Sequence, residues 1–368
     1  MRTSTERILT THTGSLPRPA TLHDRHDPGA LRAAVAETVR RQLDAGVDIV
    51  NDGESSKPSY ATYVIERLSG FGGEPEPIQP RADDDFPEFT RTMRARFTSA
   101  VVPAPTCDGP VAYVDTSQVE TDIANLRACS DGATDTFMTA ASPGIIEMYS
   151  PNRYYRSTTE YLFALADAMK TEYDAIAQAG IVLQLDCPDL ACAWVTERQR
   201  TVPEYRRVVA ERLEALDYAT RDIPGERMRL HLCWGNGEGP HHTDIPLADI
   251  VDLVLAARPA AVSFEAANPR HEHEWKLFEE VKLPDGKILI PGVLDSTTNF
   301  IEHPELVAQR LTRYAAVVGR NNIIAGSDCG FATLADVLTV DPKITWAKLA
   351  AMAEGARLAS KELWGVAA

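Results

Sequence analysis

The chain has 368 residues, of which 44% are hydrophobic and 24% are charged. This composition excludes a disordered or collagen-like protein, and the length is sufficient to bury a large core. The formal net charge of −16 disfavours nucleic acid and anionic membrane surfaces as partners, because their phosphate groups would be repelled.

The sequence contains no run of roughly 18 apolar residues that could span a membrane. The N-terminus has basic residues but no apolar segment after them, so we expect no signal peptide and a cytoplasmic protein. The scattered cysteines do not form a disulfide framework, and in a reducing compartment they are core residues, metal ligands or catalytic groups. They are Cys107, Cys129, Cys187, Cys192, Cys233 and Cys329.

Short apolar runs alternate with long helical patterns, which is typical of a parallel sheet with helical connections. Strands are expected at residues 8–13, 47–50, 136–141, 181–186, 229–233, 260–265, 288–294 and 323–327. Helices are expected at residues 30–45, 158–179, 203–221, 247–256, 272–280, 304–318 and 345–360. The pattern predicts an α/β fold, a (β/α)8 TIM barrel, with residues 1–368 as one domain. The competing open, doubly wound sheet lacks its glycine-rich phosphate-binding turn after the first strand.

Residues 70–115 interrupt the alternation with two adjacent glycines and several prolines. The segment is too long for a plain loop in a compact domain. We therefore expect an insertion after the second strand–helix unit, containing a β-hairpin built from residues 89–102 and 109–114.

Four potential metal ligands fall at the ends of predicted strands: His231, Cys233, Glu265 and Cys329. The alternation of side chains along a strand places His231 and Cys233 on one face, and a closed barrel brings the other two to the same rim. Thiolate, imidazole and carboxylate ligands suit Zn²⁺. The alternative is that the cysteines and the histidine are buried core residues and that Glu265 forms a salt bridge.

A zinc ion with two thiolates and one carboxylate would carry a net charge of −1. Such a centre polarises a carbonyl group poorly but stabilises a bound thiol as a nucleophilic thiolate. The sequence therefore predicts alkyl transfer to sulfur. A non-catalytic barrel stabilised by zinc is a second hypothesis.

The landmarks of the chain resemble the catalytic half of cobalamin-independent methionine synthase and its single-domain relatives, which include epoxyalkane:coenzyme M transferase. They are residues 10–17, 52–54, 184–186, 231–233, 263–265, 291–293 and 327–330. The resemblance implies a TIM barrel that binds zinc through the four residues named above. It also implies that Ser15, Glu54 and Asp186 hold the amino-acid end of homocysteine, since two carboxylates suit an ammonium group. A barrel like uroporphyrinogen decarboxylase would give no reason for Cys233 and Cys329.

The sequence departs from the methionine synthase pattern in ways that weaken methyltetrahydrofolate as the donor. Cys187 replaces the glutamate that usually follows the aspartate of residues 184–186, and is either a buried apolar substitute or an additional thiol at the site. Asp295 follows residues 291–293, but the histidine that acts as general acid toward folate is missing. The tryptophan that stacks on folate has no evident counterpart either.

Other segments are more similar to the epoxyalkane transferase. Arg153 or Arg270 could clamp a sulfonate or carboxylate with two hydrogen bonds, or could form a structural salt bridge. His241 and His242 follow a glycine-rich loop and, together with Asp295, are the candidate proton donors for a leaving group. As the alternative, these loop histidines are exposed residues without a catalytic role.

The expected activity is that of a zinc-dependent S-alkyltransferase, in the first place a methyltransferase, that activates a small thiol such as homocysteine as a zinc-bound thiolate. The alternative is the opening of an epoxide ring by the bound thiol. The expected partners are the thiol and its alkyl donor. The sequence is compatible with a homo-oligomer but does not determine the oligomeric state.

Overall fold

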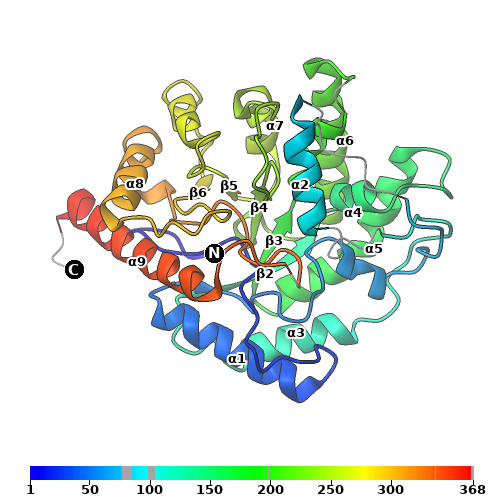
Figure 1. Cartoon of the computed structure of the whole chain (residues 1–368), viewed down its shortest axis with the longest axis horizontal. Helices are drawn as coiled ribbons and strands as arrows, with labels where there is room; N and C mark the ends of the chain where they lie inside the picture. The colour runs from blue at the N-terminus through cyan, green and yellow to red at the C-terminus, as the bar shows by residue number, and fades with distance from the viewer. Residues whose placement is uncertain (77–84, 98–103, 198, 336, 366–368) are drawn as a thin grey trace.

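The centre of the molecule is a parallel sheet whose six strands follow one another in chain order (Figure 1). The structure is a computed structural model, and it describes residues 1–76, 85–97, 104–197, 199–335 and 337–365. The strands are β1 (Ile49–Val50), β2 (Asp135–Ala141), β3 (Val182–Asp186), β4 (Met228–Leu232), β5 (Ala261–Phe264) and β6 (Ile288–Pro291). Each of these strands lies within, or one residue beyond, a strand predicted from the sequence.

The first and last predicted strands, residues 8–13 and 323–327, form isolated parallel bridges instead of continuous strands. The Ile324 amide donates a hydrogen bond to the Leu289 carbonyl of β6 at 3.0 Å, and the Thr11 amide donates to Ala325 at 2.8 Å. The first segment in turn accepts hydrogen bonds from the backbone at β1. Several of its own amides bond to side chains instead of strands, which interrupts the regular ladder.

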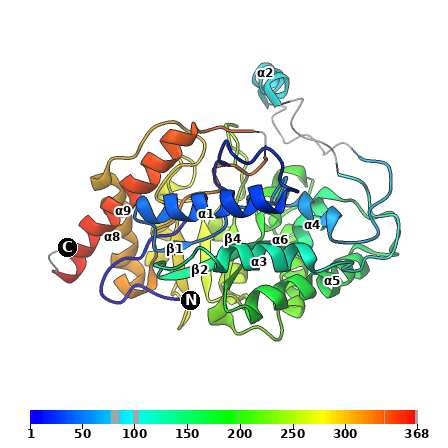
Figure 2. The same ribbon diagram turned by 90° about the horizontal axis from the view of Figure 1, so that it is seen from below.

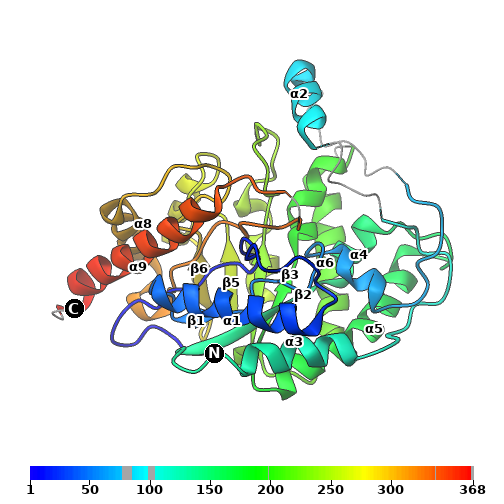
Figure 3. The same cartoon turned by 60° about the horizontal axis from the view of Figure 1, so that its bottom comes forward.

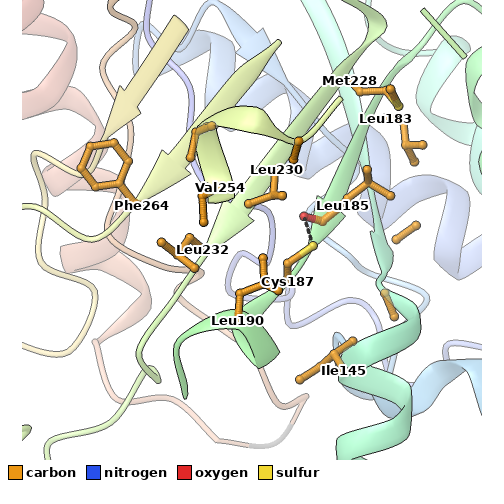
Figure 4. Close-up of a cluster of buried hydrophobic side chains, with 14 of the residues drawn as sticks. Ile145, Leu183, Leu185, Cys187, Leu190, Met228, Leu230, Leu232, Val254 and Phe264 are labelled. Atoms are coloured by element: carbon orange, nitrogen blue, oxygen red, sulfur yellow. Dashed lines mark hydrogen bonds between the residues drawn. The ribbon is translucent and has the colours of Figure 1, made fainter. Parts of the chain in front are cut away.

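Successive residues of each strand point to opposite faces of the sheet, so each face is covered by its own layer of side chains. Figure 4 shows Leu183, Leu185, Leu230 and Leu232 among the buried apolar side chains of one such layer. The residues between them lie on the opposite face of the sheet. His231 therefore faces away from this layer, as the alternation along the strand predicts.

Helices surround the sheet (Figure 1). The α-helices are α1 (Pro28–Asp44), α2 (Pro87–Phe97), α3 (Ser117–Arg127), α4 (Pro143–Tyr149), α5 (Thr158–Gln178), α6 (Val202–Ala219), α7 (Val251–Ala256), α8 (Pro304–Val318) and α9 (Pro342–Trp364). The 3₁₀ segments are η1 (Thr62–Glu66), η3 (Pro188–Leu190), η4 (Cys192–Thr196), η5 (Gly225–Arg227), η6 (Leu247–Asp249), η7 (Glu272–Glu279) and η8 (Arg320–Asn322).

Local sequence explains where many of these helices begin. The Asp27 side chain accepts hydrogen bonds from the amides of Gly29 and Ala30, and Pro28 occupies the first position of α1. Most predicted helices are confirmed, but residues 272–280 form a 3₁₀ helix and residues 247–256 form a short 3₁₀ turn followed by α7. Helices α3 and α4 were not predicted. No helix in the described part of the chain has the length and apolarity that a membrane crossing requires.

The hairpin predicted within residues 70–115 is wrong. Residues 87–97 form helix α2, which begins with a proline and has Glu88 in its first turn, two features that favour a helix N-terminus. Residues 98–102 of the predicted hairpin lie outside the described residues. The second expected strand, residues 109–114, pairs instead with residues near Leu68, which forms an antiparallel bridge with Tyr113.

Helix α2 stands apart from the ring of helices (Figures 2 and 3). It is connected to the rest of the described structure through His242, which contacts the residues that precede the helix. The Nε2 atom of His242 lies 2.8 Å from Asp85, and its ring packs edge-on against Phe86 at a centroid distance of 5.0 Å. The segment thus lies against the loop that follows β4.

Candidate active site

Three of the four predicted metal ligands lie together. His231 is in β4, Cys233 follows that strand, and Cys329 follows the segment that ends near residue 327. One ligand atom from each residue lies within 4.8 Å of the others, and all three side chains are buried. The two sulfur atoms are 3.7 Å apart. The geometry therefore brings a soft donor set to one point.

The His231 ring shows that this set fits a metal ion. Both of its ring nitrogens are buried without a well-formed hydrogen bond among the described residues, so one of them is available to bind a metal ion. Burial and the nearby Arg229 lower the pKa of His231 to about 3, so the ring is neutral, as a ligand must be. The hydrogen bond with Cys329 and burial raise the pKa of Cys233 well above its usual value. A divalent cation would reverse that shift by stabilising the thiolates.

Glu265, the fourth predicted ligand, lies beside this set but is not within 4.8 Å of all its donor atoms. Its carboxylate accepts hydrogen bonds from the Trp234 amide and the Asn268 side chain, both at 2.7 Å. Burial raises the pKa of Glu265, and the nearby His271 acts in the opposite direction. Glu265 is thus held next to Cys233 by an adjacent backbone amide.

Asp328 belongs to the landmark at residues 327–330, but sequence reasoning did not predict its role in holding this loop. Its Oδ1 atom accepts from the amides of Ala266 and Ala267, and its Oδ2 atom accepts from the amide of Asn268, each at 2.8 Å. Asp328 therefore connects the loop after Glu265 to the turn that carries Cys329. An acidic residue directly before a candidate ligand was the available signal.

A cavity of about 380 Å³ opens on the three ligands. Ser15, Glu54 and Asp186, the residues expected to bind the amino-acid end of the substrate, line the same cavity. The sequence hypothesis that these residues gather near the metal ligands agrees with this arrangement.

The carboxyl groups of Glu54 and Asp186 disfavour each other's ionisation. Burial and the charge of Glu54 raise the pKa of Asp186 to about 8, while a hydrogen bond from Gln184 at 2.7 Å acts in the opposite direction. Burial also raises the pKa of Glu54, against the effect of the Lys57 charge. The Lys57 ammonium group donates hydrogen bonds to both oxygens of Thr139. A cationic ligand between the carboxylates would relieve their repulsion.

Close packing brings Ser15 to the cavity. The Ser15 carbonyl accepts a hydrogen bond from Phe331 at 2.9 Å, and a Cβ atom at Gly330 would lie 2.0 Å from the Ser15 hydroxyl. The N-terminal segment and the turn after Cys329 can approach this closely only because residue 330 is glycine.

Comparison with known proteins identifies the family of the chain. Residues 110–357 match the model of the family described as cobalamin-independent synthase, catalytic domain. The chain belongs to this family.

Relatives in the family cover nearly the whole chain. The methionine synthase of Saccharolobus solfataricus is 24% identical over 373 residues, covering 97% of this chain and 96% of that protein. The methionine synthase of Sulfolobus acidocaldarius is 25% identical over 372 residues, covering 97% and 93%. The resemblance stated from the sequence is confirmed, and the chain is an enzyme of methionine synthase-like type.

Solved structures show the same fold. A B12-independent methionine synthase from Shewanella sp. W3-18-1, in complex with selenomethionine, superposes with a TM-score of 0.78 at 21% identity, covering 98% of this chain and 100% of that chain. A putative vitamin-B12-independent methionine synthase from Listeria monocytogenes has a TM-score of 0.66 at 15% identity and full coverage of both chains.

Of the three candidate proton donors, two line the cavity and one is not among its described lining residues. His241 and His242 line the cavity, whereas Asp295 is not among its described lining residues and accepts hydrogen bonds from the amide and hydroxyl of Thr297. His241 has a left-handed backbone (φ 52°), and its Nδ1 atom lies 2.6 Å from the Asp244 carboxylate. The role of the three residues as acids stays a prediction.

Neither candidate anion clamp is among the described residues that line the cavity. Arg153 forms an ion pair with Glu76. The guanidinium group of Arg270 donates to the His242 carbonyl at 3.2 Å, and the side chain is exposed. The structure therefore does not bring the two arginines to the metal ligands.

Two further cysteines have different environments. Cys187 is buried in the apolar layer, where its thiol donates to the Leu185 carbonyl at 3.5 Å (Figure 4). It is thus a buried substitute and not an additional thiol of the cavity. Cys192, to which sequence reasoning assigned no role in the site, lines the cavity instead.

Proposed function

We propose that the chain is a zinc-dependent methyltransferase that methylates the sulfur of a small aminothiol such as homocysteine. One observation carries the proposal: the donor atoms of His231, Cys233 and Cys329 open on the cavity that Glu54 and Asp186 also line. A sulfur-binding centre and an ammonium-binding pair thus share one space. The methionine synthase names of the relatives support the same reaction class.

His231, Cys233 and Cys329 would hold the zinc ion, with Glu265 as the fourth ligand. Bound there, zinc supplies a lower pKa for the substrate thiol, and its electron-rich ligands preserve the nucleophilicity of the sulfur. The hydrogen bonds from Trp234 and Asn268 orient Glu265 toward this role.

Glu54 and Asp186 would bind the substrate ammonium group. At neutral pH, Asp186 retains its proton because burial and Glu54 raise its pKa to about 8. Arrival of an ammonium group lowers that pKa, and the released proton leaves to solvent. The pair then fixes the amino end of the substrate, with the Ser15 hydroxyl beside it, so that the sulfur is directed toward the metal ligands.

The charge of the cavity favours an aminothiol over a sulfonate thiol. Its described lining contains carboxylates but no lysine or arginine, and Arg153 and Arg270 lie elsewhere. A sulfonate would therefore meet no cationic side chain from this part of the chain. This argues against the epoxide-opening alternative with coenzyme M.

We also propose that the protein is one complete (β/α)8 barrel with residues 70–115 as an insertion. The hydrogen bonds that connect β6 to β1 through the first and last extended segments support eight units. Such closure explains how Cys329, near the end of the chain, reaches Cys233.

Two measurements on the intact protein test the proposed activity. Purified enzyme is expected to hold about one zinc ion per chain, and in the cobalt-substituted enzyme homocysteine is expected to intensify the sulfur-to-cobalt charge-transfer band. Glu54→Gln should weaken homocysteine binding strongly without loss of metal. A protein that never retains zinc, or a cobalt spectrum unchanged by homocysteine, would contradict the proposal.

A further inference from the structure

One part of the cavity lining, which we call the aromatic wall, consists of aromatic side chains. They are Tyr60, Phe89 and Tyr149. The hydroxyl groups of Tyr60 and Tyr149 are 3.1 Å apart, and their rings meet edge-to-face at a centroid distance of 6.1 Å. Burial, Tyr149 and Cys192 raise the pKa of Tyr60, and Cys233 contributes to the same shift. Tyr60 and the proposed metal ligand Cys233 thus line the same cavity.

The described lining of this cavity carries acidic side chains that no lysine or arginine of the lining balances, and Asp186 becomes negatively charged once it loses its proton. The acidic side chains among its described lining residues are Glu54, Asp186, Glu238 and Asp244, and the lining contains no lysine or arginine. His241 and His242, which also line it, are paired with Asp244 and Asp85. Such a space concentrates cations and repels anions.

Cationic side chains also lie near the cavity, outside its described lining. Arg229 acts on Asp186 and His231, and His271, whose pKa is raised to about 9, lies 3.2 Å from the Asp244 carboxylate. Lys57 donates its hydrogen bonds to Thr139, beneath Glu54. Arg18 bonds to the backbone carbonyls of Glu54 and Lys57. Both groups stand at the end of the cavity that carries the carboxylate pair, where one substrate ammonium group is already accommodated.

The charge of the donor decides whether the transfer needs a proton. A donor that leaves as an amide or alkoxide anion needs a proton during transfer. Asp295 lies outside the described cavity lining, whereas His241 and His242, each hydrogen-bonded with a carboxylate, belong to it. A donor whose leaving atom begins with a positive charge leaves as a neutral molecule and requires no proton.

We propose that the alkyl donor is a small onium cation, a sulfonium or quaternary ammonium compound, whose charged centre rests against Tyr60 and Tyr149. The proposal rests on the function proposed above. In the transfer, a lone pair of the substrate thiolate forms the new S–C bond. The bond from that carbon to the onium atom breaks, and its electron pair neutralises the sulfur or nitrogen. No proton and no redox partner enters this step.

The cavity volume and the aromatic faces suit such a donor. A cavity of about 380 Å³ is small among ligand pockets, which span roughly 300–1,000 Å³. Aromatic faces attract methylated onium groups through cation–π interactions, and the attraction is strongest when water is excluded.

The charge preference can be tested with two probes, choline and its neutral isostere 3,3-dimethylbutan-1-ol. Each is bound to the zinc-loaded enzyme in the presence of homocysteine. Calorimetry is expected to show at least tenfold tighter binding of choline. Tyr60→Leu should weaken choline binding about 2- to 30-fold and leave the isostere unchanged, because one cation–π contact is lost. Tyr60→Phe should retain most of the affinity, and Tyr218→Leu, far along the chain in α6, is the matched control. Equal binding of the two probes would overturn the proposal.

Turnover with separate donors tests the chemistry. Methylation of homocysteine by S-methylmethionine identifies a sulfonium donor, and methylation by glycine betaine identifies a quaternary ammonium donor. Methionine formed only from methyltetrahydrofolate or methylcobalamin would overturn the onium proposal while supporting the methyltransferase function. The onium proposal would also be overturned if no donor supports turnover and choline binds no tighter than its isostere. If the cobalt spectrum is then unchanged by homocysteine, the proposed function fails as well.

Discussion

The sulfur atoms of Cys233 and Cys329 lie 3.7 Å apart although 96 positions separate them along the chain. Their separation is short because the loop after β4 and the turn after residue 327 end at the same edge of the sheet. With a ring nitrogen of His231, they form a preassembled donor set. A preassembled set binds metal without the entropic cost of ordering the loops first.

Cys329→Ser is expected to lower zinc affinity at least about 100-fold, because the hydroxyl group is a much poorer soft ligand. Competition with a chromophoric chelator measures the affinity, and circular dichroism checks that the barrel remains folded. Cys129→Ser, at a half-buried position at the end of α3, is the control and should retain full zinc content. Equal zinc affinity in the two variants would contradict the assigned ligand set.

Asp328→Asn is expected to weaken zinc binding about 10- to 100-fold through the loop that carries Glu265. The amide oxygen of asparagine can still accept from Ala266 and Ala267, but its NH₂ group would face the Asn268 amide, where the native carboxylate accepts. The cobalt spectrum should change in shape, because the orientation of the fourth ligand is lost. The exposed Asp285→Asn provides the control, and an unchanged spectrum in both variants would refute this role.

Asp186→Asn is expected to stabilise the substrate-free enzyme at pH 7–8. Burial and Glu54 raise the folded-state pKa of Asp186 from 3.8 to about 8. The favourable contribution of the protonated carboxyl group is therefore complete below pH 3.8 and is lost as the pH rises through about 8. The variant should gain on the order of 5 kcal/mol in the free energy of unfolding at pH 8 and little near pH 4. Urea unfolding measures this difference.

The same Asp186 variant should bind homocysteine more weakly, because the ammonium group loses a charged partner. Stabilisation together with unchanged homocysteine affinity would show that the residue is buried but does not bind substrate. A loss of stability at pH 8 would contradict the raised pKa itself.

His271 should make stability depend on pH above neutrality. Burial disfavours its charged form, but hydrogen bonds with Asp244 and Glu274 outweigh this effect and raise its pKa from 6.5 to about 9. Its stabilising contribution is thus complete below pH 6.5 and is lost as the pH rises through 9. The wild-type enzyme should lose more free energy of unfolding between pH 6.5 and pH 9.5 than His271→Gln. Parallel pH profiles for the two proteins would refute the charged state.

By itself, the sequence determined the order of the strands, the face of β4 that carries His231 and Cys233, and the family. These features are local, because the alternation of side chains and the spacing of motifs repeat over a few residues. The position of Cys187 in the apolar layer was one of two stated alternatives, and only packing decided between them.

The tertiary structure decided what depends on contacts between distant segments. Helix α2 replaced a predicted hairpin strand, since the tertiary structure pairs residues 109–114 with residues near Leu68 and leaves residues 87–97 to their own helical preference. The contacts of Asp328 with the loop after Glu265 span about 60 residues. The aromatic wall joins Tyr60 to Tyr149 across 89 residues. Spacing along the chain carries no information about such pairs, because their distances are fixed only when the sheet curves and brings its loops to one edge.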